Sequence, residues 1–391
     1  MTLSDPAAAR DPVALSCRAV DGMGAVDAGA WDAMTGGDNP FLSHDFLSTL
    51  EQTGCVGASE GWLPHHLLLY RDERLAGACP AYLKDNSYGE FVFDWGWAEA
   101  YQRHGLDYYP KLLSAVPFTP AAGPRLLCAP GEDRSLVCRG LVSAAVQFAG
   151  QAELSSAHWL FTDADDTREL EGLPLLHRWG CQFHWHNAPF RDFQDYLDAL
   201  TSKRRKQVRR ERREAASAPV AVELRHGDEL SEADIAAYHA LYCSTYDRKW
   251  GYPSLSLEFF LRLAERMPRR LIIILARREG RCVAGAHLLR GDSALFGRNW
   301  GCSEHHRSLH FEICYYRGIE YCIEQGLARF EAGAQGEHKL TRGFLPVRTS
   351  SFHWIRDARF RDAIGEFVAR ERAETRGYIH AAGLHSPYRR P

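Results

Sequence analysis

Two segments of the chain, one in each half, share the same order of apolar and polar positions. Residues 65–84 and 270–290 each read as an apolar strand, a charged turn and a second strand. A turn of small residues and an aromatic stretch follow each segment, at 86–97 and at 291–301. We expect both aromatic stretches to be strands.

The spacing between matching positions barely changes along this repeat. Trp300 follows Trp95 by 205 positions, and Tyr315 follows Tyr108 by 207. Each of these tyrosines belongs to a Tyr-Tyr pair that opens a stretch we expect to be helical. Ordered matches over about 40 residues predict a duplicated unit.

The second half continues with alternating helical and strand patterns. A basic helix without proline or glycine is expected at 193–217, and a strand at 220–224. Further helices are expected at 232–250 and 256–267, ahead of the hairpin. Hairpin strands followed by a helix and another strand indicate a mixed sheet rather than a doubly wound parallel one. The expected fold class is therefore α/β (α+β).

The duplication predicts two domains, residues 1–190 and 191–391, each a mixed β-sheet flanked by helices. Neither half contains a G-x-G-x-x-G or a G-x-x-x-x-G-K-[ST] loop. This disfavours a dinucleotide-binding fold and a P-loop NTPase.

Composition narrows the class of protein. Apolar residues make up 45% and charged residues 25% of the chain, as in soluble globular proteins. The net charge of −3 supplies no general attraction to nucleic acid. The longest apolar run, 271–276, is too short to cross a membrane, and the N-terminus lacks the pattern of a secretory signal. We expect a cytoplasmic protein with no membrane span and no DNA partner.

Cysteine and lysine usage add two further points. The eleven cysteines include no C-x-x-C pair, which argues against a zinc ribbon or a disulfide framework. Arginine is the usual cation of this chain, because only six of its 47 basic residues are lysine. These lysines are Lys84, Lys111, Lys203, Lys206, Lys249 and Lys339.

Three stretches of the second half resemble the FemAB-like acyl and aminoacyl transferases. They are the basic segment 200–215, the segment 309–333 and the sequence EHKLTRGFLPV at 337–347. Residues 39–47, 108–127 and 333–347 are similar to a bacterial branch of N-acyltransferases within that superfamily. The resemblance covers roughly residues 38–370.

This resemblance implies a fold, a reaction and a set of substrates. The fold would be two tandem GNAT-like domains, with the acceptor on the first and the acyl donor on the second. The reaction would be direct attack of an amine on a thioester or ester donor, with acyl-CoA or aminoacyl-tRNA as co-substrate and no tightly bound cofactor. The acceptor would be a small-molecule, peptide or glycan amine related to peptidoglycan. The segment 303–308, SEHHRS, lacks the glycines of an acetyl-CoA diphosphate loop.

The turn after the expected strand at 328–333 carries the first group of candidate catalytic residues. By the resemblance, Lys339 lies near the acyl donor, where its charge would stabilise an oxyanion. His338 or Glu337 would act as the base. Glu331 and Gln335 are candidate substrate-binding residues. The alternative is a polar surface turn with no catalytic role.

A second group lies in the aromatic stretch of the first half. Asp94 is a further candidate proton acceptor, and Asn299 takes its place in the second half. An aromatic groove with carboxylates would suit a sugar or peptide acceptor. Its candidate residues are Trp97, Glu99, Tyr101 and Tyr109. A core strand with a hydrophobic loop explains the same pattern.

The basic helix supplies candidate donor-binding residues, Arg204, Arg205 and Arg209, which would contact phosphate. The alternative is a solvated helix, because helical geometry spreads its charges around the axis. His184 with His186, and His306 with His310, are ordinary histidines on this interpretation, so no metal site is expected. Two other functions stay open: a non-catalytic recognition module for a cell-wall precursor or nucleotide-linked glycan, and an RNA-binding protein.

Overall fold

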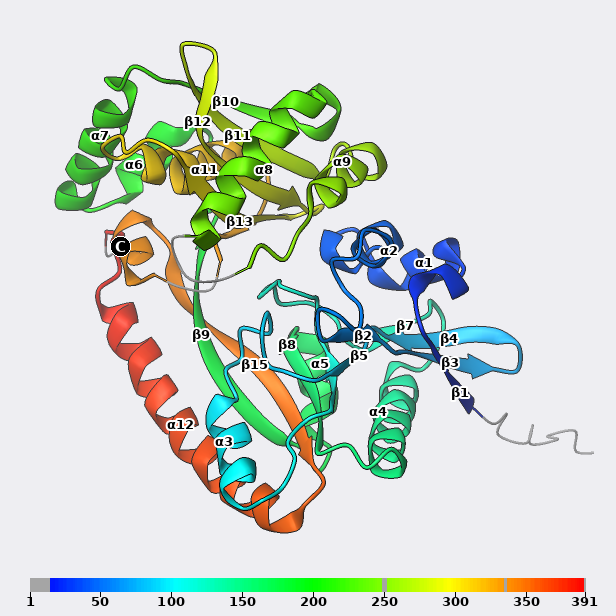
Figure 1. Cartoon of the computed structure of the whole chain (residues 1–391). Coiled ribbons are helices and arrows are strands. Elements are labelled where there is room, and N and C mark those ends of the chain that lie inside the picture. Colours follow the sequence, from blue (N-terminus) through cyan, green and yellow to red (C-terminus); the bar gives the residue numbers. More distant parts are fainter. Residues whose placement is uncertain (1–14, 248–251, 334–335, 390–391) are drawn as a thin grey trace, which may run out of the picture.

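The computed structural model describes residues 15–247, 252–333 and 336–389. The described strands form a four-stranded sheet, in the order β1-β3-β4-β7, and an 11-stranded sheet that runs through both halves. Helices cover these sheets, and two long strands connect the upper and lower parts of the molecule in Figure 1. This confirms the mixed α/β class.

The first half contains nine strands and five longer helices in its described part. The strands are β1 (Leu15–Val20), β2 (Trp62–Pro64), β3 (His66–Arg71), β4 (Arg74–Cys79), β5 (Tyr82–Lys84), β6 (Lys111–Ser114), β7 (Leu127–Cys128), β8 (Ser156–Thr162) and β9 (Leu176–His186). The helices are α1 (Ala28–Thr35), α2 (His44–Gln52), α3 (Trp95–Arg103), α4 (Arg134–Gln151) and α5 (Ala164–Glu171), with short 3₁₀ turns at Met23–Ala25 and Pro40–Leu42.

The second half begins with the expected basic segment, which forms two helices instead of one. The helices are α6 (Phe193–Ala199), α7 (Ser202–Ala216), α8 (Glu232–Asp247), α9 (Leu257–Arg266), α10 (Leu309–Phe311), the π-helix η4 (Glu312–Tyr316), α11 (Arg317–Glu324), the 3₁₀ helix η5 (Glu337–Arg342) and α12 (Ala358–Leu384), with a 3₁₀ turn η3 (Gly227–Glu229). The strands are β10 (Ala221–His226), β11 (Leu271–Arg278), β12 (Arg281–Arg290), β13 (Ala294–Cys302), β14 (Arg329–Glu331) and β15 (Leu345–Ile355).

Side-chain caps mark where several helices begin. The Ser43, Asp133 and Ser256 side chains accept hydrogen bonds from backbone N–H groups in the first turns of α2, α4 and α9. Such caps satisfy donors that have no partner within the helix. The boundaries of these helices therefore follow from local sequence.

Strand β11 explains the apolar run of the sequence. Leu271, Ile273 and Leu275 pack toward α8 and α9, whereas Ile272 and Ile274 pack toward the helices on the other face. A strand that is buried on both faces requires an uninterrupted apolar sequence. The run is therefore the centre of a sheet.

Strands β9 and β15 are exchanged between the two halves. β9 belongs to the first half but pairs with β14 of the second, whereas β15 belongs to the second half and pairs with β8 of the first. β9 and β15 also pair with each other over nine residues of β15, Leu345–His353. The expected domain boundary at residues 190/191 falls just after β9. β15 and α12 come after this boundary in the sequence, but they lie against strands of the first half (Figure 1).

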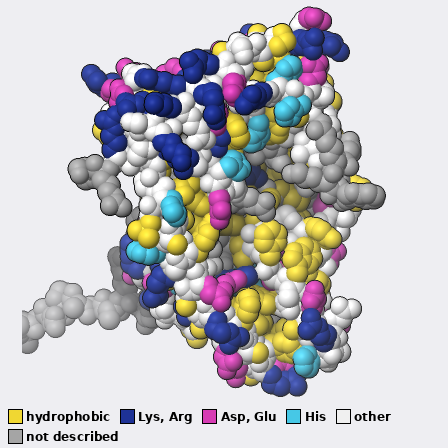
Figure 2. Space-filling view, turned by 90° about the vertical axis from the view of Figure 1, so that its left-hand side faces the viewer, with side chains coloured by type: hydrophobic (Ala, Val, Ile, Leu, Met, Phe, Trp, Pro, Cys, Tyr) yellow, Lys and Arg dark blue, Asp and Glu magenta, His cyan; other side chains and the backbone are white. Residues whose placement is uncertain are grey.

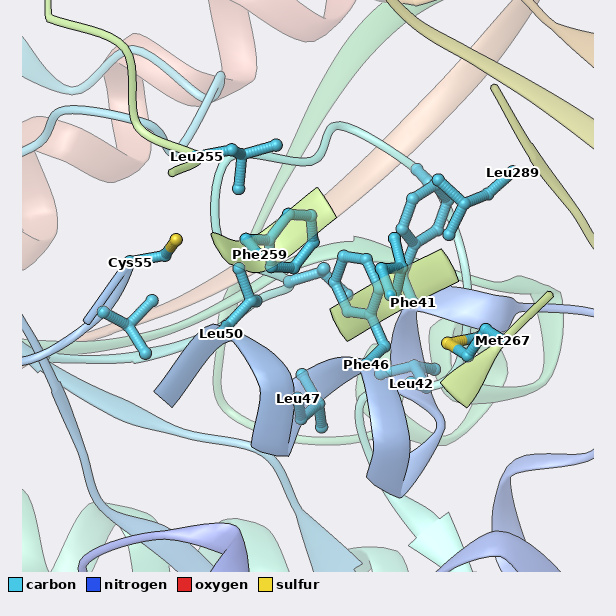
Figure 3. Close-up of a cluster of buried hydrophobic side chains, with 14 of the residues drawn as sticks. Phe41, Leu42, Phe46, Leu47, Leu50, Cys55, Leu255, Phe259, Met267 and Leu289 are labelled. Atoms are coloured by element: carbon cyan, nitrogen blue, oxygen red, sulfur yellow. The ribbon is translucent and has the colours of Figure 1, made fainter. Parts of the chain in front are cut away.

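One hydrophobic core also spans both halves. Phe41, Phe46 and Leu50 of the first half pack against Phe259 and Met267 of the second (Figure 3). The Phe46 and Phe259 rings meet edge to face, with centroids 5.7 Å apart. The halves therefore bury apolar surface against each other as a single folding unit would.

Two expectations from the internal repeat are wrong. Residues 86–94 form no strand, and α3 begins at Trp95; the polar side chains of this segment bind Lys111 instead of lining a sheet. Residues 111–114 form β6, where a helix was expected. β6 pairs with β5 and β8 and is wholly buried, so tertiary pairing outweighs the local pattern.

The corresponding elements of the second half agree with the sequence. The aromatic stretch there forms β13, and its tyrosine pair lies within the continuous helical segment from α10 to α11. Across the described ranges, no helix combines the length and apolar character needed to cross a membrane.

Candidate active site

A gap between two parallel strands of the second half forms the centre of the candidate site. β13 and β14 pair from Ala294–Arg329 to Phe296–Glu331 and then separate. A cavity of about 100 Å³ lies where they diverge. We call this gap the splay. The residues that line it include Gly297, Arg298, Asn299 and Trp300 of β13, Ala332 after β14, and His310, Cys314 and Tyr315 of the following helix.

A β-bulge lies at the same point of β13. Ala286 of β12 pairs with Trp300, but Leu288, two residues later, pairs with Gly297, three residues earlier. β13 therefore carries one extra residue, at Arg298–Asn299. A bulge removes a residue from the ladder and redirects its backbone groups. Backbone N–H groups released here are suitable donors for a carbonyl oxygen in the splay.

Lys339, on η5, is a buried cation that does not line this cavity itself but interacts with Cys314, which does. Its side chain is 2% exposed, and Nζ donates a hydrogen bond to the Gly333 carbonyl oxygen at 2.7 Å. Within the described residues, no carboxylate lies within ion-pair distance of Nζ. Burial lowers the pKa of Lys339 to about 8, and the neighbouring Cys314 thiol acts in the opposite direction. An anion in the splay would supply the missing counter-charge.

Tyr315 and His338 form a hydrogen-bonded pair at the edge of the splay. The Tyr315 hydroxyl lies 2.7 Å from His338 Nε2. Burial raises the pKa of Tyr315, so its hydroxyl stays protonated. His310 packs edge to face against both Tyr315 and Trp300, and burial lowers its pKa to about 4. The tyrosine is a possible proton donor, and the exposed His338 connects it to solvent.

Glu331 lies on the other side of β14, in a cleft between the two halves. This cleft has a volume of about 760 Å³ and is also lined by Asp38, His184 and Arg329. Glu331 Oε1 accepts a hydrogen bond from Arg329 at 3.0 Å, and Oε2 has no hydrogen-bond partner in the described structure. Burial raises the pKa of Glu331, with Arg329 opposing. A carboxylate in this state accepts a proton more readily than an exposed one.

Glu337 and Asn299 have other contacts. The Tyr378 hydroxyl of α12 donates to Glu337 Oε1 at 2.8 Å, so the Glu337 side chain is directed away from the splay. Asn299 lines the splay, and its Nδ2 donates to the Tyr246 hydroxyl at 3.2 Å. Gln335 lies outside the described residues.

Asp94 lies in a buried ion cluster of the first half. Lys111 Nζ is 2.5 Å from Asp94 Oδ2 and 2.9 Å from Glu90 Oε2, and the Tyr108 hydroxyl donates to Asp94 at 2.7 Å. Burial raises the pKa of Asp94, but the charge and hydrogen bond of Lys111 outweigh burial and hold this pKa at about 2. Asp94 is therefore a structural counter-ion of Lys111.

The other first-half candidates surround this cluster. Trp97 and Tyr101 are buried beside α12, Tyr109 binds the Ser87 hydroxyl at 2.8 Å, and Glu99 is exposed and paired with Arg103. This group and the splay lie near opposite ends of α12. Tyr101 stacks on Phe360, near the start of α12, and Glu337 contacts Tyr378, 18 residues further along. At 1.5 Å per residue the separation is roughly 27 Å.

The basic helix α7 has an inner side that is bound to the protein. Arg205 pairs with Asp198 at 2.6 Å, Arg204 donates to Gln207, and Arg209 donates to Gln194. Four exposed cations repeat every three or four residues, which places them along one side of the helix. They are Lys203, Lys206, Arg210 and Arg213, and we call them the α7 stripe; Arg209 is also exposed but binds Gln194 of α6. Figure 2 shows Lys and Arg side chains gathered at the end of the molecule that carries α6 and α7.

The start of the helix after β13 carries an acidic neighbour. The Ser308 hydroxyl donates to Glu214 Oε2 of α7 at 2.7 Å, and Arg307 lies 3.3 Å from the same carboxylate oxygen. A helix N-terminus otherwise attracts phosphate. The Glu214 carboxylate lies at this helix start, with Arg307 as its counter-ion.

The histidine pairs of the sequence form no metal cluster in the described structure. The rings of His184 and His186 are 6.5 Å apart, and His306 binds Glu304 at 2.9 Å. Across the described ranges, no group of three His, Cys, Asp or Glu side chains is arranged to hold a metal ion.

Sequence reasoning missed several residues of this site. Tyr315 was identified only as a marker of the repeat, and His310 only as half of a histidine pair. No sequence pattern indicated that Cys314 or Arg298 belongs to the site, because a bulge and a strand splay arise from tertiary pairing. For Lys111 there was a weak signal, since it is one of six lysines in an arginine-rich chain.

The divergent parallel strands, the bulge and the following helix belong to a mixed α/β fold in which one 11-stranded sheet runs through both halves. Solved structures show the same fold. FemX matches with a TM-score of 0.53 and 11% identity, over 85% of this chain and 96% of that chain. L-PGS from Bacillus licheniformis matches with a TM-score of 0.51 and 11% identity, over 86% of this chain and 98% of that chain.

The chain belongs to the FemAB-like family, described as peptidoglycan biosynthesis or recognition, which matches residues 22–390. No curated protein shows significant sequence similarity to it. A tandem GNAT protein from the clavulanic acid biosynthesis pathway is a further structural neighbour, with a TM-score of 0.47 and 11% identity over 88% of this chain and 98% of that chain.

Proposed function

We propose that the protein transfers an acyl or aminoacyl group to an amine in peptidoglycan-related synthesis. The donor is a thioester or an ester and lies in the splay between β13 and β14. The amine lies in the cleft between the halves and attacks the donor carbonyl directly, without a covalent enzyme intermediate. The acceptor is a small-molecule, peptide or glycan amine.

The observation that carries this proposal is the state of Lys339. A buried lysine without a counter-ion is costly unless it meets an anion during function. The negative charge of a tetrahedral intermediate, or a phosphate of the donor, would develop within its reach. At a pKa of about 8, Lys339 carries its charge at neutral pH. The bulged backbone of β13 would donate to the same oxygen.

Two proton transfers complete the reaction. As the new C–N bond forms, the amine nitrogen loses a proton, and Glu331 accepts it, because burial favours the protonated carboxyl. As the C–S or C–O bond breaks, the leaving group takes a proton from Tyr315. His338, bound to the Tyr315 hydroxyl, returns a proton from solvent.

Two observations favour an aminoacyl-tRNA donor over acyl-CoA. Glu214 lies at the helix start where a CoA diphosphate would bind. The α7 stripe offers cations to a polyanion, and α7 contacts η5, since Arg342 pairs with Glu211 at 2.8 Å. An RNA bound along α7 would therefore have its 3′ end near Lys339.

Thermal unfolding with each donor tests the proposal. A donor at 100 times its Kd adds about 2.7 kcal/mol, which corresponds to a rise of about 3 °C in Tm for a chain of this size. We expect this rise with aminoacyl-tRNA, and its loss in Cys314→Phe, which fills the splay. Lys84→Met, which removes a buried lysine of the first half, is the matched control and should keep the rise. No rise with aminoacyl-tRNA or acyl-CoA would contradict the proposal.

A further inference from the structure

Two buried lysines hold the loop 85–94 of the first half in place. Lys84 Nζ donates to Asn86 Oδ1 at 3.2 Å and to the Tyr88 carbonyl oxygen at 3.3 Å. Lys111 Nζ donates to Ser87, Glu90 and Asp94 at 2.5–2.9 Å. Loops seldom receive this many buried, charge-assisted hydrogen bonds. The loop is therefore held in one conformation before any ligand binds.

This loop and the residue after it present aromatic side chains to solvent. Tyr88, Phe91, Phe93 and Trp95 are between 37% and 70% exposed, and the Tyr88 and Trp95 rings pack edge to face. Exposed aromatic rings that are held rigidly are characteristic of binding surfaces. Hydrophobic side chains also appear in the lower part of the face shown in Figure 2.

A cavity of about 350 Å³ lies beneath the loop, between it, β9, β15 and α12. Its walls are largely aromatic, and its floor carries uncharged hydrogen-bonding groups. The aromatic residues are Phe91, Phe93, Phe161 and Trp179, and the polar residues include Gln182, Thr349, Ser350, Ser351 and Thr375. We call this cavity the loop pocket.

The charged groups of the loop pocket already neutralise each other. Arg178 Nε and Nη2 donate to both carboxylate oxygens of Glu371, at 2.6 and 2.7 Å, and Nη1 donates to the Phe93 carbonyl oxygen at 2.9 Å. A charged ligand would have to compete with this pair. The pocket therefore favours an uncharged ligand.

Two phenylalanines of the loop pocket have left-handed backbone conformations. Phe91 has φ 60° and Phe161 has φ 55°, values that are unusual for a bulky residue. Phe161 is the extra residue where the pairing of β8 with β15 shifts, between Leu160 and Thr162. Bulges and strained residues concentrate at functional sites, where they direct a side chain.

We infer that the loop pocket binds the uncharged hexopyranose ring of a carbohydrate. Aromatic rings can pack on the C–H faces of a sugar, and the hydroxyls of Thr349 and Thr375 can exchange hydrogen bonds with its hydroxyls. The cavity has room for about twelve water molecules, or about twice the volume of one hexopyranose, so a sugar ring fits together with its substituents. The size, the neutrality and the polar floor agree with a substituted sugar unit.

The loop pocket lies next to the cleft that holds Glu331. Ser350 lines both cavities. Gln182, of the loop pocket, is hydrogen-bonded through Oε1 to His184 of the cleft at 3.0 Å. A glycan bound here would extend toward the splay. The assignment of this sugar to the acceptor rests on the proposed function, whereas sugar binding itself does not.

Saturation-transfer NMR with calorimetry tests this inference on the full chain. The probes are N,N′-diacetylchitobiose, maltose and the anionic glucose 6-phosphate. We expect at least one uncharged disaccharide to bind and glucose 6-phosphate to bind more weakly. Phe93→Ala should raise the Kd for the sugar by about tenfold, because one aromatic ring no longer packs on it. Thr375→Trp, which fills the cavity from α12, should abolish binding.

The control is Leu136→Ala, an exposed apolar truncation on α4, which should leave the Kd unchanged. Lys339→Met should also bind the sugar normally, so a failure of acyl transfer is distinguishable from a failure of sugar binding. The absence of binding to both disaccharides would overturn the inference. Binding that is unchanged in both Phe93→Ala and Thr375→Trp would also overturn it. So would attachment to phosphatidylglycerol vesicles without sugar binding, which would assign the aromatic loop to a membrane surface.

Discussion

At the scale of single residues, three of the five lysines in the described residues are buried, and each has a different environment. Lys111 is surrounded by carboxylates, Lys84 lies 4.1 Å from the centre of the Trp62 ring, and Lys339 has one backbone carbonyl as its hydrogen-bond partner in the described structure. Burial lowers the pKa of Lys84 to about 7 and that of Lys339 to about 8, whereas Glu90 and Asp94 outweigh burial and raise the pKa of Lys111. These environments distinguish Lys84 and Lys111, which hold the loop 85–94, from Lys339, the catalytic candidate.

Lys111→Met should destabilise the fold by about 3–5 kcal/mol, because it leaves Glu90 and Asp94 buried without a counter-ion. Urea unfolding at pH 7 measures this loss. The loss should shrink at pH 4, because the abandoned carboxyls then bind protons. Lys84→Met, which breaks no ion pair with a buried carboxylate, is the control and should cost less. Equal losses in the two variants would show that the ion cluster does not hold the loop.

The rate of acyl transfer should fall as pH rises through about 8. Lys339 loses its proton on this side of its pKa, and the neutral amine cannot stabilise an oxyanion. Lys339→Arg should move this limb to higher pH, because arginine stays charged. Profiles of kcat/KM between pH 6 and 10 provide the comparison. An alkaline limb that stays at the same pH in Lys339→Arg would assign the titration to another group.

Only some of the candidate site residues could be identified from the sequence. Lys339 could be identified through its family motif and through the rarity of lysine. The burial of Asp94 could not, because its counter-ion Lys111 follows 17 residues later on a strand that the repeat pattern assigned to a helix. A buried ion pair depends on tertiary pairing, which local patterns do not contain.

At the scale of elements, α7 divides its charges between two functions. Its inner side binds the protein through Arg205, Glu211 and Arg212, and its stripe faces solvent. The sequence predicted one helix over 193–217, where the structure has α6 and α7, and suggested that its charges were spread around the axis. The partners on α6, η4 and η5 decide which arginines are available, and they come from distant segments.

Reversing two charges of the α7 stripe should weaken RNA binding. Lys203→Glu combined with Lys206→Glu should lower the affinity for aminoacyl-tRNA by at least about tenfold. It should also reduce the slope of log K against log salt by about 0.7–0.9 for each phosphate that the protein no longer neutralises. Filter binding at several salt concentrations measures both. Arg74→Glu with Arg139→Glu, on exposed first-half positions, makes the same change in net charge and should have a smaller effect.

Equal losses of RNA affinity in the two double variants would show that the α7 stripe acts only through the overall charge of the protein. An unchanged affinity in both double variants would show that α7 does not bind aminoacyl-tRNA. In either case the splay would keep its candidate chemistry, because the donor-dependent rise in Tm tests that site separately.

The sequence repeat was informative for hairpins and misleading beyond them. The two hairpins have the same form, at β3–β4 and at β11–β12. After the first hairpin, residues 86–94 form the lysine-held loop instead of a strand. A loop that is stabilised by buried ion pairs carries aromatic and polar residues in a pattern that resembles an amphipathic strand.

At the scale of the whole molecule, the exchange of β9 and β15 links the halves. The first-half sheet is completed by β15, and β14 pairs with β9. The core around Phe46 and Phe259 adds a second link. The cleft that holds Glu331 draws its residues from both halves, so its geometry depends on these links.

The chain should therefore unfold in one cooperative transition, and residues 1–190 alone should not fold. Phe259→Ala should destabilise this single transition by about 3–5 kcal/mol. Calorimetry of the full chain, and the far-UV spectrum of the 1–190 fragment, provide the measurements. Two separate transitions, with only one of them shifted by Phe259→Ala, would show that the halves are independent.

Single-turnover acyl transfer by Lys339→Met tests the central claim most directly. With saturating amine, loss of the Lys339 charge should lower the transfer rate constant by about 10²–10³-fold. Arg139→Met removes an exposed charge on α4, outside the splay and the loop pocket, and should keep the wild-type rate within a factor of about three. A slow Lys339→Met beside a nearly normal Arg139→Met would support acyl transfer in the splay. Equal rates in Lys339→Met and the wild type would contradict it.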